Sequence, residues 1–106
     1  MTKIVNLTTE TFDEGIKRGL VLVDFWATWC GPCKTELPAF DAAYADYGED
    51  VQFIMLNLTD GYSDTVEGVK RFVADGGYSF PVYYDTRLEG AKTYGASSIP
   101  LTVFID

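Results

Sequence analysis

The sequence predicts a single α/β domain built around a mixed or parallel sheet. Apolar runs alternate with segments of helical periodicity from one end of the chain to the other, and this alternation is typical of such a fold. The run at residues 20–26 is almost continuously apolar, which is typical of a central strand covered on both faces. With 106 residues the chain has room for one hydrophobic core, so the expected domain is residues 1–106.

Five predicted strands follow one another along the chain, each a short apolar segment. They occupy residues 4–7, 20–26, 51–58, 81–84 and 101–105. The fourth begins at its own proline, Pro81, because a strand tolerates proline at its first residue.

Four predicted helices lie between these strands. Their ranges, from capping residue to last periodic residue or closing glycine, are 8–19, 33–47, 64–77 and 85–95. The expected capping residues are Thr8 or Thr9 for the first helix, Asp64 in a capping box with Glu67 for the third, and Asp85 or Thr86 for the fourth. In the second helix, Glu36 is expected to be a first-turn acid favoured by the helix dipole, and Pro38 predicts a kink rather than an end.

The composition excludes several classes of function. Because the chain has no histidine, Ser-His-Asp and Cys-His catalysis and histidine-ligated zinc or haem are excluded. The formal net charge of −8 argues against binding to nucleic acid or to an anionic membrane. No stretch approaches the roughly 18 apolar residues of a membrane span, and residues 1–7 lack the layout of a signal peptide. The expected location is cytoplasmic for the chain as given, or extracytoplasmic if a leader was removed.

The motif that carries chemistry is Trp29-Cys30-Gly31-Pro32-Cys33, between the central strand and the second helix. Unpaired N–H groups and the positive end of the helix stabilise a thiolate at Cys30, so an accessible Cys30 with a low pKa is the expected nucleophile. Cys33 is placed to resolve the mixed disulfide, and Pro32 costs little in a first turn. The alternatives are a structural disulfide, half of a metal site shared between chains, or two inert thiols. Redox chemistry is favoured because the motif lies at a strand-to-helix junction, so no metal or other cofactor is expected.

Asp24 interrupts the apolar run six residues before Cys30. A carboxyl group buried there would have a raised pKa and could exchange a proton with Cys33, directly or through water. The alternative is an aspartate that faces solvent near a strand end, but its strongly apolar neighbours favour burial. Trp29, next to Cys30, is expected to line the substrate face rather than to be plain packing.

Ile99-Pro100 precedes the last predicted strand. The proline could be cis and mark a constrained turn, or it could be an ordinary trans proline that opens a strand. The spacing of the residues does not decide between the two.

Residues 23–34 (VDFWATWCGPCK) closely resemble the active-site strand and helix start of the thioredoxin superfamily. Pro38 stands where that family kinks its helix, and the segment from Tyr94 to Pro100 resembles its cis-proline loop. Within the superfamily, Glu36-Leu37-Pro38 and an extra helix and strand at about residues 60–84 are more similar to the TlpA/ResA-type branch. The Gly31-Pro32 pair is instead the thioredoxin pair, which in the family accompanies reducing behaviour.

The resemblance implies a thioredoxin-like mixed sheet flanked by helices and a thiol-disulfide oxidoreductase. It implies that Cys30 is the nucleophile, Cys33 the resolving thiol and Asp24 the proton acceptor. It also implies a cis Pro100, with Ile99 contacting the substrate backbone. The implied partners are protein disulfides and an electron donor such as a reductase. The alternative is a thioredoxin-fold binding module without turnover.

The substrate-binding surface is expected to include Trp29, Gly31 and Pro32 beside the cis-proline loop. Two features depart from the family pattern. Met55 occupies the place of a lysine that commonly lies near the buried aspartate, so Asp24 is expected to be harder to ionise. The sequence also stops before the family's last strand and helix, so residues 1–106 are expected to be a C-terminally truncated domain.

Overall fold

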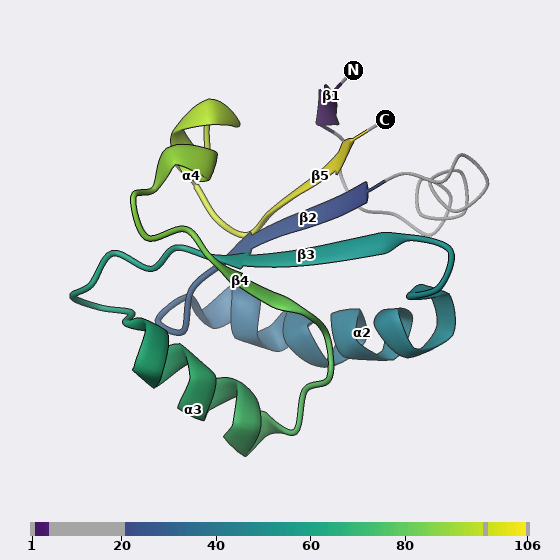
Figure 1. Ribbon diagram of the computed structural model, residues 1–106, viewed down its shortest axis with the longest axis horizontal. Coiled ribbons are helices and arrows are strands. Elements are labelled where there is room, and N and C mark those ends of the chain that lie inside the picture. The colour runs from purple at the N-terminus through teal and green to yellow at the C-terminus, as the bar shows by residue number, and fades with distance from the viewer. Residues whose placement is uncertain (1, 5–20, 97, 106) are drawn as a thin grey trace.

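The computed structural model describes residues 2–4, 21–96 and 98–105. Within them the chain forms a five-stranded mixed sheet with the strand order β1-β5-β2-β3-β4 (Figure 1). The strands are β1 (Thr2–Ile4), β2 (Val21–Trp26), β3 (Gln52–Asn57), β4 (Val82–Tyr84) and β5 (Leu101–Ile105). The helices are α2 (Gly31–Tyr47), α3 (Val66–Gly76) and α4 (Glu89–Thr93).

Strand direction confirms the predicted mixed sheet. β2 runs parallel to β3, and β3 runs parallel to β4, whereas β5 is antiparallel to both β2 and β1. Parallel neighbours need a crossover connection, and α2 and α3 supply the two that join these parallel pairs. The central position of β2 explains why its sequence is almost continuously apolar.

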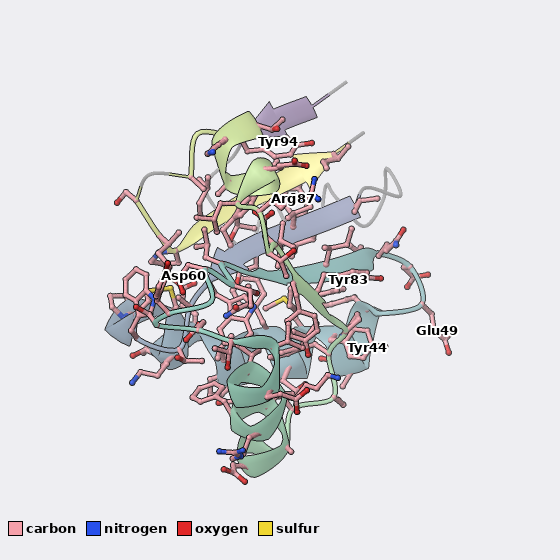
Figure 2. The ribbon with its side chains drawn as sticks, turned by 60° about the vertical axis from the view of Figure 1, so that its left-hand side comes forward. Tyr44, Glu49, Asp60, Tyr83, Arg87 and Tyr94 are labelled. Carbon is pink, nitrogen blue, oxygen red and sulfur yellow. A yellow bond between two sulfur atoms is a disulfide. The ribbon has the colours of Figure 1, made fainter. Side chains whose placement is uncertain are left out.

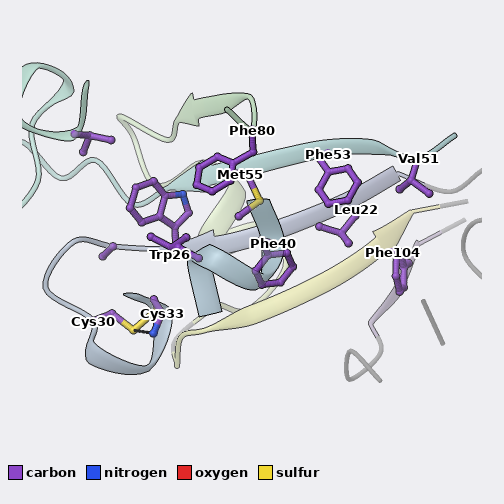
Figure 3. Packing of buried hydrophobic residues seen from close by; sticks show 13 residues of the cluster. Leu22, Trp26, Cys30, Cys33, Phe40, Val51, Phe53, Met55, Phe80 and Phe104 are labelled. Atoms are coloured by element: carbon purple, nitrogen blue, oxygen red, sulfur yellow. Dashed lines mark hydrogen bonds between the residues drawn. A yellow bond between two sulfur atoms is a disulfide. The ribbon is translucent and has the colours of Figure 1, made fainter. Parts of the chain in front are cut away.

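Helices cover both faces of the sheet. Figure 1 shows α2 and α3 on one face and α4 on the other. The larger core lies beneath α2, where Leu37 and Phe40 of that helix join inward-facing residues of the sheet such as Phe53 (Figure 3). The smaller core on the opposite face gathers Val23, Phe25, Val103 and Ala91. Because β2 contributes to both cores, its C-terminal end is held rigidly where the redox motif begins.

Several element boundaries differ from the sequence-based expectations. The first strand spans Thr2–Ile4, whereas the sequence predicted residues 4–7. Residues 5–7 of that predicted strand and the helix expected at 8–19 lie outside the described residues. Helix α2 begins at Gly31 instead of residue 33, because the Cys30 side chain is its N-cap. Glu36 is therefore in the second turn and not in the first.

The caps of the later helices also correct the predictions. Thr65, and not Asp64, caps α3: its hydroxyl accepts the backbone N–H of Gly68. In α4 the preceding residue makes no side-chain cap, but the Asp85 carboxylate accepts the N–H groups of Gly90 and Ala91 from outside the helix. Asp85 therefore satisfies donors that the helix itself leaves unpaired.

Candidate active site

A disulfide joins Cys30 and Cys33 at the start of α2 (Figure 3). The backbone N–H of Cys33 donates a hydrogen bond of 3.2 Å to Cys30 Sγ, so the sulfur takes the place of a capping oxygen. Pro32 occupies the first turn, where a missing N–H costs nothing. In the reduced protein the same N–H and the helix end would stabilise a thiolate on Cys30.

The two sulfur-bearing residues differ in exposure. Cys30 is 5% exposed and Cys33 is 1% exposed. Cys30 is thus less accessible in the disulfide form than the sequence suggested, because the Ile99 loop packs over it: its Sγ lies 3.9 Å from the carbonyl oxygen of Ile99. Of the two cysteines, Cys30 keeps the larger exposed fraction.

The predicted substrate-binding residues adjoin the two cysteines along the chain or belong to the Ile99-Pro100 loop, which approaches Cys30. The Ile99-Pro100 peptide bond is cis, and both residues are half-buried. Gly31 and Pro32 are exposed, and Trp29 is 58% exposed, which is unusual for so large an apolar side chain. The fold therefore brings the cis-proline loop to Cys30 from 69 residues away along the chain.

Asp24 is buried on β2, with only 1% of its surface exposed. Loss of hydration raises the pKa of its carboxyl group to about 8, with a further contribution from the negative charge of Glu36. The hydroxyl of Thr102 donates to Asp24 Oδ1 at 3.3 Å and opposes this rise. Met55 is the register partner of Asp24 on β3, as expected, and it supplies no charge.

Glu36 is a functional candidate that the sequence reading missed. Its pKa is raised by partial burial, and its charge acts on Asp24. The signal in the sequence was its position three residues after Cys33, which places both residues on one face of the helix.

The sequence predicted that Asp64 caps a helix, but its carboxylate lies against Thr28 instead. Asp64 is 2% exposed and binds the backbone and the side chain of Thr28, two residues before Cys30. It also accepts a hydrogen bond from the amide of Asn57. Its position next to Thr65, a second capping residue, was the only hint in the sequence that its carboxylate was free for another role.

Among residues 2–4, 21–96 and 98–105, no group of three or more cysteine, aspartate or glutamate side chains is arranged to hold a metal ion. No helix in these ranges is long and apolar enough to cross a membrane.

Comparison with known proteins decides the family. The thioredoxin family model matches residues 3–71. The chain belongs to the thioredoxin family. It is 33% identical over 105 residues to a thioredoxin from Pseudomonas aeruginosa, a match that covers 97% of this chain and 94% of that protein. A thioredoxin from Staphylococcus haemolyticus is 43% identical over 60 residues, covering 57% of this chain and 58% of that relative.

Other relatives support the TlpA/ResA-type branch. The thiol-disulfide oxidoreductase ResA of Oceanobacillus iheyensis is 37% identical over 86 residues, covering 80% of this chain and 43% of its own length. The structure resembles StoA from Bacillus subtilis with a TM-score of 0.74 and 28% identity, covering 82% of this chain and 65% of that one. It resembles the exposed lipoprotein thioredoxin of Streptococcus pneumoniae with a TM-score of 0.73 and 28% identity, covering 82% and 66%. The matched region is therefore less than two thirds of several of these proteins.

Proposed function

We propose that this chain is a thiol-disulfide oxidoreductase that reduces protein disulfides through the Cys30/Cys33 dithiol. The observation that carries the proposal is the Cys30–Cys33 disulfide at the N-cap of α2, with the Cys33 N–H aimed at Cys30 Sγ. This geometry favours a reactive thiolate on the first cysteine and keeps the second within bonding distance. Family membership supports the same conclusion.

The reaction balances in two exchange steps. The Cys30 thiolate attacks one sulfur of a substrate disulfide, and the other substrate sulfur leaves as a thiolate. Cys33, once deprotonated, attacks Cys30 Sγ, and the second substrate sulfur leaves. The substrate gains two electrons, and Cys30 and Cys33 are left joined as a disulfide. A partner that supplies two electrons, such as a reductase, then restores the dithiol.

Asp24, in its ionised form, is proposed to accept the proton of Cys33 in the second step. A carboxyl group with a pKa of about 8 is close to an ordinary thiol pKa, so transfer between them is nearly balanced. Burial raises the pKa of Asp24 into this range, and Met55, its register partner on β3, carries no positive charge that would lower the pKa again. The transfer takes place directly or through one water molecule.

The substrate is proposed to bind across the surface formed by Trp29, Gly31, Pro32, Ile99 and Pro100. Exposure of the first three and the approach of the Ile99 carbonyl to Cys30 support this surface. An extended segment that places its disulfide over Cys30 could pair with the backbone of the cis-proline loop.

The two candidate compartments imply different electron donors. A cytoplasmic location fits regeneration by a soluble reductase, and an extracytoplasmic one fits a chain whose leader has been removed. The likeness to an exposed lipoprotein thioredoxin supports the extracytoplasmic alternative.

An insulin-type disulfide reduction assay tests the proposal. We expect wild-type protein to turn over and Cys30→Ser to be inactive, because only the Cys30 thiolate starts the reaction. Cys33→Ser should accumulate mixed disulfides through Cys30. A binding module without turnover would show neither wild-type activity nor trapped mixed disulfides, and activity that survived in Cys30→Ser would contradict the mechanism.

A further inference from the structure

We propose that Asp64 is a positioning residue of the redox site, which fixes the turn carrying Cys30 by binding Thr28. The inference deepens the proposed function, because it concerns the reactivity of the same cysteine. The juxtaposition that carries it is a buried carboxylate from the loop before α3 lying against the loop before α2.

The contacts of Asp64 point to this loop. Its Oδ2 accepts the backbone N–H of Thr28 at 2.8 Å, and its Oδ1 accepts the Thr28 hydroxyl. The Asn57 side-chain amide donates to Oδ2 at 2.8 Å, and Asn57 Oδ1 in turn accepts the hydroxyl of Thr59. Two of the three donors to this carboxylate therefore belong to one residue, 36 positions earlier in the chain.

Capping of α3 does not explain why the Asp64 carboxylate is buried. Thr65 already caps that helix through its hydroxyl, at 3.1 Å from the Gly68 nitrogen. A buried carboxylate is costly unless it is fully hydrogen-bonded, and bonds to an ionised acceptor are stronger than neutral ones. The buried Asp64 carboxylate therefore accepts hydrogen bonds from Thr28, in the loop before α2, and not from the first turn of α3.

Thr28 connects this contact to the nucleophile. A turn runs from Ala27 to Cys30, closed by the Cys30 N–H donating to the Ala27 carbonyl at 3.2 Å, and Thr28 is its first central residue. Cys30 then acts as the N-cap of α2. Movement of the turn would therefore move the sulfur away from the Cys33 N–H that stabilises its thiolate.

The loop that presents Asp64 is itself ordered by hydrogen bonds. Asp60 Oδ1 accepts the N–H groups of Tyr62 at 2.8 Å and Asp64 at 3.2 Å, and the Gly61 N–H donates to the Asp64 carbonyl. Figure 2 shows Asp60 at the same end of the molecule as the disulfide. Hydrogen bonds within the loop therefore hold Asp64 in place for its contact with Thr28.

Substitutions at Thr28 test the contact without removing the carboxylate. Alkylation of reduced protein by iodoacetamide, followed across pH with the Cys30 adduct identified by mass, measures the reactivity of the thiolate. We expect Thr28→Val, which loses the hydroxyl donor but keeps the backbone N–H to Asp64, to lower the rate at neutral pH by about fivefold and to shift the pH profile upward, because the turn is held less firmly. Thr28→Ser keeps the hydroxyl and should stay within about twofold of wild type.

A matched pair of carboxylate deletions separates positioning from general stability. Asp85 is also buried and also accepts two hydrogen bonds, but from α4. We expect Asp64→Ala to slow Cys30 alkylation by about tenfold and Asp85→Ala to leave it unchanged. If Asp64→Ala does not fold, the two Thr28 variants decide the matter.

The proposal is overturned if Thr28→Val alkylates with the rate and pH profile of Thr28→Ser, or if folded Asp64→Ala alkylates as fast as Asp85→Ala. The alkylation series does not depend on turnover. Failure of wild-type protein to reduce insulin would therefore overturn the proposed function while leaving the role of Asp64 to be decided by the rates.

Discussion

Replacing Asp24 with asparagine should stabilise the protein at neutral pH. The pKa of Asp24 rises from 3.8 to about 8 on folding, mainly because burial penalises the charged form. Between these values the unfolded chain is ionised while the folded chain holds its proton, so stability falls as pH rises from about 4 to about 8. Asparagine has nearly the same shape, keeps an acceptor for Thr102 and carries no charge to desolvate.

The size of the effect follows from the shift. Between pH 3.8 and pH 7 the free energy of unfolding falls by about 1.4 kcal/mol per pH unit, which comes to about 4 kcal/mol in all. Asp24→Asn should therefore match wild type near pH 4 and exceed it by up to about 4 kcal/mol at pH 7, with the difference levelling off above pH 8.

Urea unfolding at several pH values measures this difference. Both proteins are kept oxidised, because Cys30 and Cys33 do not titrate while they are joined. Glu36→Gln is a second variant: removing that charge should lower the pKa of Asp24 and narrow the range over which wild-type stability falls.

Asp85→Asn is the matched control, since it neutralises another buried aspartate, whose carboxylate accepts two backbone N–H groups of α4. It should show no gain in unfolding free energy that grows with pH. A difference between wild type and Asp24→Asn that is flat from pH 4 to pH 8, or a variant less stable at pH 7, would refute the reasoning.

Three further substitutions test neighbouring parts of the structure. Met55→Lys places an ammonium group opposite Asp24 and lowers its pKa, so the fall in stability with pH should still begin near pH 4 but end at a lower pH than in wild type, measured by urea unfolding. Asp85→Ala removes two hydrogen bonds at α4 and should cost about 1–2 kcal/mol of unfolding free energy, measured by urea unfolding. Trp29→Ala should change stability by less than about 0.5 kcal/mol but raise KM in insulin reduction, because the side chain is exposed beside the disulfide. An unchanged KM would remove Trp29 from the substrate surface.

Much of the fold was predictable because its signals are local. The apolar run at residues 20–26 predicted a buried central strand, and β2 lies between β5 and β3 with both faces covered. Gly76-Gly77 predicted the end of a helix, and α3 ends there with Gly77 in the left-handed region. These features depend on neighbours within a few residues, where backbone preference and periodicity act directly.

Helix starts were predicted less well, because several side chains can compete for one cap. Asp64 and Thr65 are both good capping residues, and their order in the sequence does not say which one turns inward. The contacts of Asp64 with Thr28 decide it, since they satisfy a buried carboxylate. The same limit applies to Cys30, whose sulfur served as a cap one turn earlier than the periodic apolar residues indicated.

The sequence by itself determined the chemistry: two cysteines three residues apart at a helix start lie on one turn, so their pairing needs no distant contact. Tertiary structure alone decided what surrounds them. It brought Ile99 to Cys30 in a cis-proline loop, set Thr102 and uncharged Met55 beside Asp24, and seated Asp64 on Thr28. These contacts span from 31 to 78 positions along the chain. Such pairings depend on strand order, register and burial, which arise only when the whole sheet closes.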